Sequence, residues 1–247
     1  MLQLHNEHPV RLRLTLPALI VTFLLGCTTT VPETVRVQDA ALPDYKVKSH
    51  RVEEAIDLYI EPQIRNLRVE VTPHSNADAF SSIPVHVGPS LERALLSITR
   101  QHFSKSTMVD APAGRPTLSY ELLTYRPVVD VVPEAGSTRL NVSARLALQL
   151  SIHSANGEQL FSTTAIGTSH VSDTKLSPGN RLKDGARLLE VATRDAIIDA
   201  MYDISSIFGN ANDIIQSEVL TSEIDPNFGV ETFDDVILNL RTRREED

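Results

Sequence analysis

Few side chains in this sequence are suited to chemistry, and they lie far apart along the chain. The 247 residues include one cysteine, Cys27, which directly follows Leu24-Leu25-Gly26. An ionised thiol is a nucleophile and a metal ligand, whereas a thiol in a core behaves as a small hydrophobe. Cys27 ends an apolar run and precedes three threonines. This position favours a modified thiol over a buried one.

The other candidates are histidines and aspartates. Six histidines follow Cys27 without the spacing of a helical metal site: His50, His74, His86, His102, His153 and His170. We expect His102 to end a helix, where a protonated ring favours the helix dipole. Asp195, Asp199 and Asp203 recur at every fourth position. This spacing would suit a cation-binding ridge, but nearby arginines favour an ordinary exposed polar face. Nucleophile-elbow, HExxH, GxxxxGK[ST] and GxGxxG motifs are absent from the sequence, so we expect no catalytic residue, metal or cofactor.

The first 26 residues have the layout of a secretory signal. Arg11 and Arg13 lie in a polar segment, and an almost uncharged run extends from Leu14 to Leu25. That run is too short to span a bilayer, which takes about 20 apolar residues. Leu24-Leu25-Gly26-Cys27 resembles the lipobox of bacterial lipoproteins, whose cysteine receives a diacylglycerol and becomes the first mature residue. The resemblance implies lipidation of Cys27. Thr28, rather than Asp, follows, which by resemblance to Gram-negative lipoproteins implies the periplasmic side of the outer membrane.

Composition limits the partners of the mature chain. Removing the signal leaves 221 of the 247 residues, enough for one domain with tails. The signal carries two arginines and one glutamate, so the net charge changes from −9 to −10. Nucleic acid is a poor partner for such a chain, and we expect acyl chains, not attraction to anionic headgroups, to hold it on a membrane. With Cys27 lipidated, no thiol remains for a disulfide.

Four segments follow from the sequence pattern: a signal peptide (1–26), an acylated cysteine with a flexible tether (27–52), a folded domain (53–209) and an acidic tail (210–247). The stretch from Thr28 to about Ser49 lacks apolar periodicity, and its roughly 22 residues would reach about 75 Å when extended. An added N-terminal strand around Val35 and Val37 is the alternative.

Hydrophobic periodicity predicts an α+β fold. Alternation indicates strands at 55–60, 67–71, 117–131, 138–153 and 158–170, whereas helical spacing indicates helices at 89–103 and 184–208. We expect loops at 73–88 and 173–184, and a helix stop at Gly209-Asn210. In the strand 138–153 the even positions are apolar and most odd positions are polar, which indicates one covered face and one free face. The elements predict a mostly antiparallel twisted sheet with two amphipathic helices packed on one face.

This outline supports a resemblance to known envelope proteins. An acylated cysteine, a tether, a long hairpin closed by Asn156-Gly157 and a final amphipathic helix are similar to the small envelope lipoproteins of the YajG type. They are also similar to the auxiliary lipoproteins of lipid-transport ABC systems. The similarity covers residues 20–208 and implies a non-enzymatic accessory or scaffold role in an envelope assembly or transport system. Its partners would be a membrane, through the lipid anchor, and other envelope proteins; homo-oligomerisation stays open. The alternatives are a lipid- or glycan-binding lipoprotein and an envelope hydrolase.

The tail after Gly209 departs from the resemblance. It carries ten acidic residues against three arginines, so we expect most of it to be disordered. One short stretch has an apolar face at helical spacing, formed by Phe233, Val236, Ile237 and Leu240. It is too short to hold as an isolated helix in water. We expect this face to dock in a groove on a partner protein, with docking on its own domain as the alternative.

Overall fold

The computed structural model describes residues 34–40, 52–75, 81–112, 114–134, 136–173 and 181–221. All of them belong to one compact unit of the chain, Pro32–Asp247. None of the helices in these residues is both long and apolar enough to cross a membrane.

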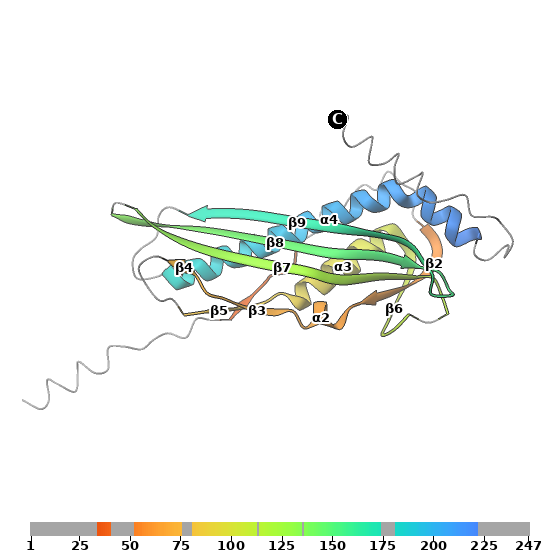
Figure 1. Ribbon diagram of the computed structural model, residues 1–247, viewed down its shortest axis with the longest axis horizontal. Helices are drawn as coiled ribbons and strands as arrows, with labels where there is room; N and C mark the ends of the chain where they lie inside the picture. The colour runs from red at the N-terminus through yellow and green to blue at the C-terminus, as the bar shows by residue number, and fades with distance from the viewer. Residues whose placement is uncertain are drawn as a thin grey trace, which may run out of the picture. The chain divides into compact units, whose positions relative to one another are not determined.

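The main element is a curled, mixed six-stranded sheet (Figure 1). Its strands are β2 (Val52–Ile60), β4 (His74–Ser75), β6 (Phe103–Val109), β7 (Thr117–Glu134), β8 (Ser137–His153) and β9 (Gln159–Asp173). The order is β6-β2-β7-β8-β9, with β4 beside the far end of β7. β7, β8 and β9 form an antiparallel meander, but β2 runs parallel to both β6 and β7. The α+β class is confirmed, whereas the prediction of a mostly antiparallel sheet is wrong. Long crossovers, not hairpins, connect β2 to its two neighbours.

The strand β8 has the two faces that its alternation predicts. Leu140, Leu146 and Leu148 are each at most 1% exposed, whereas Arg139 and Arg145 lie on the opposite face and are exposed. Gly136 and Gly157 adopt positive φ in the turns at either end of the strand. The turn at Asn156-Gly157 therefore forms as predicted, with Gly157 N–H donating to the Ser154 carbonyl at 3.0 Å.

A second sheet of three strands contains two segments that we did not expect to be regular. Its order is β1 (Val35–Arg36), β5 (Ile83–His86) and β3 (Arg68–Val71), with β1 parallel and β3 antiparallel to β5. Val35 and Val37 are buried, so the alternative of an N-terminal strand, not a tether, describes residues 34–40. The loop expected over 73–88 is also wrong, because it contains β4 and β5. Pro84 made β5 look like part of a loop in the sequence. A proline is tolerated in this strand because it has no N–H to donate, and β1 pairs only with Val85 and His86.

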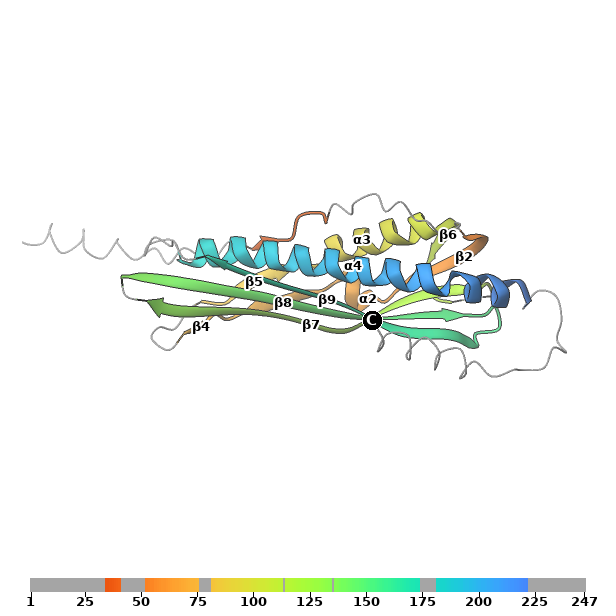
Figure 2. The same ribbon diagram turned by 90° about the horizontal axis from the view of Figure 1, so that it is seen from above.

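Three helices complete the described part of the chain: α2 (Pro62–Arg65), α3 (Gly88–His102) and α4 (Arg181–Thr221). α3 and α4 cover one face of the large sheet, and α4 runs along β8 and β9 (Figure 2). Gly185 of α4 lies between Ile83 of β5 and Leu140 of β8, so the small sheet closes the same core. α4 continues through Gly209-Asn210, where we expected it to stop. Gly209 lacks the positive φ that a glycine C-cap adopts.

Candidate functional site

Two sets of residues predicted to be functional lie outside the described residues. The first is the lipidation site, Cys27. The second is the apolar face in the tail, formed by Phe233, Val236, Ile237 and Leu240. Both stay predictions from the sequence.

The described histidines lie on different elements and do not form one site. They are His74 in β4, His86 in β5, His102 at the end of α3, His153 at the end of β8 and His170 in β9. His74 lies near a carboxylate, with Nδ1 3.8 Å from Asp130 Oδ1. Within the described ranges, no group of three or more His, Cys, Asp or Glu side chains is placed to hold a metal ion.

His102 ends α3 as expected, but its ring is buried between α3 and α4. Its Nε2 lies 3.0 Å from Ser205 Oγ, and its ring centroid lies 5.0 Å from that of Phe208. Burial lowers the pKa of His102 from 6.5 to about 4, because a buried imidazolium would lose its hydration. The expected favourable interaction of a charged ring with the helix dipole is therefore wrong, since the ring is neutral at pH 7. His102 packs α3 against α4.

The aspartates of α4 bind the backbone of β9, a role that their spacing did not reveal. Asp199 Oδ2 accepts a hydrogen bond from Thr168 N at 2.8 Å, and Asp203 Oδ2 accepts one from Ile166 N at 2.9 Å. β9 is an edge strand, so these N–H groups have no strand partner in the sheet. Asp195 instead contacts Arg194 at 3.2 Å. Asp199 is exposed and Asp195 and Asp203 are half-buried, as expected of a polar face, but two of the three aspartates also bind the sheet edge along which α4 lies.

Gly167 makes this contact between α4 and β9 possible. A Cβ atom at this position would lie 1.9 Å from the carbonyl oxygen of Ala196 and 2.5 Å from the backbone nitrogen of Ala200. Only a residue without a side chain allows the backbones of helix and strand to approach so closely. Gly167 therefore fixes the depth at which α4 packs on β9.

The hydroxyls of Tyr120, which is buried, and Tyr125, which is half-buried, join the sheet to the helices. Tyr120 Oη lies 3.0 Å from Thr99 Oγ1 of α3, and Tyr125 Oη lies 2.7 Å from Thr193 Oγ1 of α4. Burial raises the pKa of both tyrosines above the usual value, so the hydroxyls stay protonated at pH 7. Sequence analysis missed these pairs. The signal that could have indicated the second pair is Thr193, a polar residue among the buried alanines of α4.

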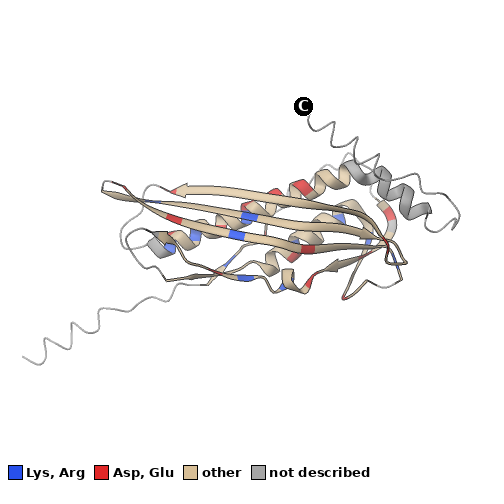
Figure 3. Cartoon of the chain, viewed as in Figure 1, with Lys and Arg blue, Asp and Glu red and all other residues tan. Residues whose placement is uncertain are grey.

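The face of the large sheet that points away from the helices is largely polar from β7 to β9. The register places these residues in cross-strand rows: Ser119, Ser151 and Ser162; Glu121, Gln149 and Thr164; Thr124, Ala147 and Ile166; Arg126, Arg145 and Thr168. Gln149 Nε2 donates to Ser162 Oγ at 3.0 Å. Charged residues occupy single, separated positions along each of these strands (Figure 3). Three large apolar side chains are exposed here: Leu123 at a β-bulge, Val132 near the end of β7 and Ile166 in β9.

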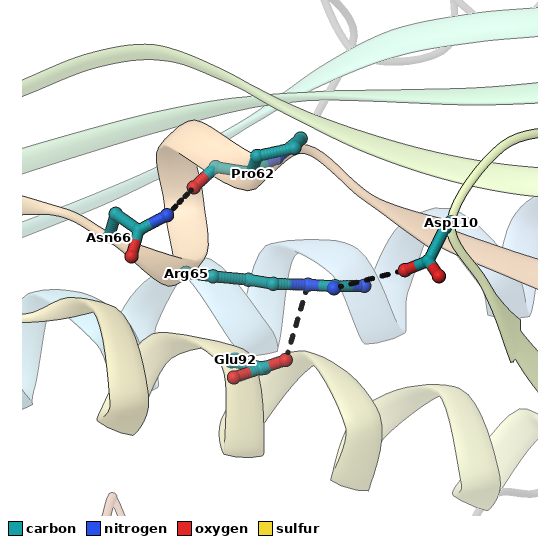
Figure 4. Close-up of polar contacts among 5 residues, drawn as sticks. All are labelled: Pro62, Arg65, Asn66, Glu92 and Asp110. Carbon is teal, nitrogen blue, oxygen red and sulfur yellow. Dashed lines mark hydrogen bonds and ion pairs between the residues drawn. The ribbon is translucent and has the colours of Figure 1, made fainter.

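Arg65 connects α2, α3 and the end of β6 (Figure 4). Its Nε lies 3.4 Å from Glu92 Oε1, and its Nη1 lies 3.5 Å from Asp110 Oδ1. Asn66 Nδ2 donates to the Pro62 carbonyl at 3.0 Å and so completes the single turn of α2. The backbone of α2 lies close to the start of α3, since a Cβ at Gly88 would be 2.2 Å from the Arg65 carbonyl oxygen. Arg65 therefore has a structural role, because its contacts join α2 to α3 and to the end of β6.

No protein-family model and no curated protein matches the sequence. The structure is similar to three solved structures of bacterial proteins. A Xanthomonas campestris protein of the family DUF330 has 12% identity and a TM-score of 0.41, over 74% of this chain and 99% of the other. A minor lipoprotein from Acinetobacter baumannii has 15% identity and a TM-score of 0.37, over 66% and 96%. The rare lipoprotein B from Shewanella oneidensis has 10% identity and a TM-score of 0.36, over 64% and 99%.

Proposed function

We propose that this chain is a lipoprotein anchored to the outer membrane, on its periplasmic side, and that it serves as a non-enzymatic accessory or scaffold component of an envelope assembly or transport system. The observation that supports the proposal most is Leu24-Leu25-Gly26-Cys27 at the end of an apolar run that is too short to span a bilayer. Cys27 is the acylated residue, and its acyl chains supply the membrane affinity.

Two features of the folded unit support a scaffold role over an enzymatic one. Among the described residues, the strongly shifted pKa values belong to His102, hydrogen-bonded between α3 and α4, and to Tyr120 and Tyr125, hydrogen-bonded between sheet and helix. Such groups hold elements together and are not presented to a substrate. The polar face of β7, β8 and β9 is a broad surface for other envelope proteins, with Leu123, Val132 and Ile166 as its exposed apolar contacts.

Replacement of Cys27 tests the anchor. Cys27→Ser removes the thiol that is acylated, so we expect loss of the acylated mature form seen by mass spectrometry of the wild-type protein. Thr28→Ser is the matched control, because it changes the next residue and keeps the cysteine. An unmodified thiol in wild-type protein isolated from membranes would refute the proposal.

The location and the role need separate measurements. Thr28→Asp is expected to move the protein from the outer to the inner membrane fraction on a density gradient, by the resemblance to Gram-negative lipoproteins. For the role, chemical cross-linking on intact cells should join the wild-type protein to other envelope proteins. Deletion of residues 229–247 is expected to remove a partner without lowering the melting temperature. A clear fall in the melting temperature would instead mean that this segment docks on its own domain.

A further inference from the structure

Three basic side chains form one row across the small sheet. The register pairs Arg36 of β1 with His86 of β5, and His86 with Arg68 of β3. Directly opposite residues of neighbouring strands share a face, and their Cβ atoms lie about 5 Å apart. Arg36 and Arg68 are exposed and His86 is half-buried, whereas the neighbouring row contains the buried Val35 and Val85. The row therefore points away from the core.

This row has no acidic partner among the described residues. Neither arginine forms an ion pair or a side-chain hydrogen bond with a described residue, although the chain has 32 acidic residues against 23 Lys and Arg. Glu70 lies on the same face, two positions after Arg68, but it forms no ion pair with these arginines. Burial lowers the pKa of His86, and the nearby Arg68 and Arg36 lower it further. Arg36 and Arg68 lie on either side of His86, two strand spacings or about 10 Å apart, so an anion that binds between them would reduce the repulsion of their charges.

The position of β1 in the chain indicates where the anion is. Val35 follows Cys27 by only eight residues, which span at most roughly 27 Å when extended. The tether expected from the sequence would have reached about 75 Å. Electrostatic attraction to a charged surface falls off over about 10 Å at roughly 0.1 M ionic strength. Among the described elements, the small sheet is thus the one that the chain holds nearest to an anchored Cys27.

We propose that Arg36, His86 and Arg68 form a contact surface for the anionic lipid headgroups of the bilayer that holds the acyl chains of Cys27. The inference rests on the proposed lipid anchor and adds an orientation to it, because the outward face of the small sheet then faces the membrane. The two arginines supply the charge, and neutral His86 supplies a hydrogen-bond donor between them. The overall negative charge of the chain does not prevent this contact, because distant charges are screened.

The test uses the full mature lipoprotein in vesicles of phosphatidylcholine alone or of three parts phosphatidylcholine to one part phosphatidylglycerol. A fluorophore is attached to a cysteine introduced as Glu70→Cys, on the same face as the row, and the vesicles carry a headgroup quencher. We expect stronger quenching in the anionic vesicles. Arg36→Gln with Arg68→Gln should remove this difference. The matched control is Arg126→Gln with Arg145→Gln, which removes the same charge from another outward-facing row and should keep the difference.

Three outcomes would overturn the inference: equal quenching in both vesicles, equal loss in the control variant, or competition by inorganic phosphate beyond that of sodium chloride at equal ionic strength. The last outcome would identify the row as a site for free phosphate. Thermal unfolding of each variant shows that it is folded. Failure of the lipid anchor is distinguishable, since the protein would then not float with either kind of vesicle.

Discussion

Gly167→Ala is expected to destabilise the protein because α4 passes directly over this residue. The added Cβ would lie 1.9 Å from the Ala196 carbonyl oxygen, where ordinary contacts begin near 3.4 Å, so helix and strand must separate by roughly 1.5 Å. Overpacking of this kind costs about 1–3 kcal/mol. The separation also weakens the hydrogen bonds from Asp199 and Asp203 to β9, which are partly exposed and add about 1 kcal/mol.

The expected loss is therefore about 2–4 kcal/mol, which for a domain of this size lowers the melting temperature by roughly 5–15 °C. Thermal unfolding followed by circular dichroism measures it. Gly185→Ala is the matched control, because Gly185 lies in α4, the helix that packs on Gly167. Its added Cβ would meet Ile83 and Leu140 at 3.7 and 3.8 Å, and alanine favours the helix by about 1 kcal/mol. A Gly167→Ala protein that melts like wild type, or a control that is equally destabilised, would refute the reasoning.

Three further predictions concern the sheet and its helices. Leu148→Asp should unfold the domain, because Leu148 is 0% exposed and an unpaired carboxylate is costly to bury; Gln149→Asp, on the outward face, should lower the urea midpoint only slightly. Because the pKa of His102 is about 4 in the fold and about 6.5 when unfolded, the unfolded chain binds more protons between these values, and stability should fall as the pH drops from 6.5 to 4. His102→Gln should flatten this pH dependence of the urea midpoint, and an unchanged slope would contradict it. Asp199→Ala with Asp203→Ala should lower the melting temperature by a few degrees and increase light scattering, because the edge of β9 loses its hydrogen-bond acceptors; a variant as soluble and stable as wild type would count against this role.

The sequence predicts those parts of the fold that rest on local patterns. The strand β8 has alternation over its whole length, and α3 has a regular apolar stripe, so both were found without knowledge of their neighbours. β1 has two residues and pairs with a strand about 50 residues further along. Its identity depends on a distant partner, and no local period reveals it. The parallel pairing of β2 was missed for the same reason, because alternation shows the faces of a strand and not its direction.

The roles of the candidate residues also differ in how far a local pattern predicts them. The buried position of His102 could have been predicted, because it continues the stripe of Leu91, Leu95 and Ile98. The role of Asp199 could not, since its partner is a backbone N–H of β9, which no side-chain pattern marks. Gly167 was the available signal, because glycine inside a strand often marks close approach of another backbone.

The placement of β2 has a consequence for the order in which the chain can assemble. β2 lies between β6 and β7 but precedes both, and Asp57 pairs with Thr117, 60 residues later. The strands β7, β8 and β9 need only short turns to pair, and contacts near in sequence form faster than distant ones. A chain that emerges amino end first holds β2 without a neighbour until Phe103 has been made. The first strand of the large sheet is therefore made first and completed last.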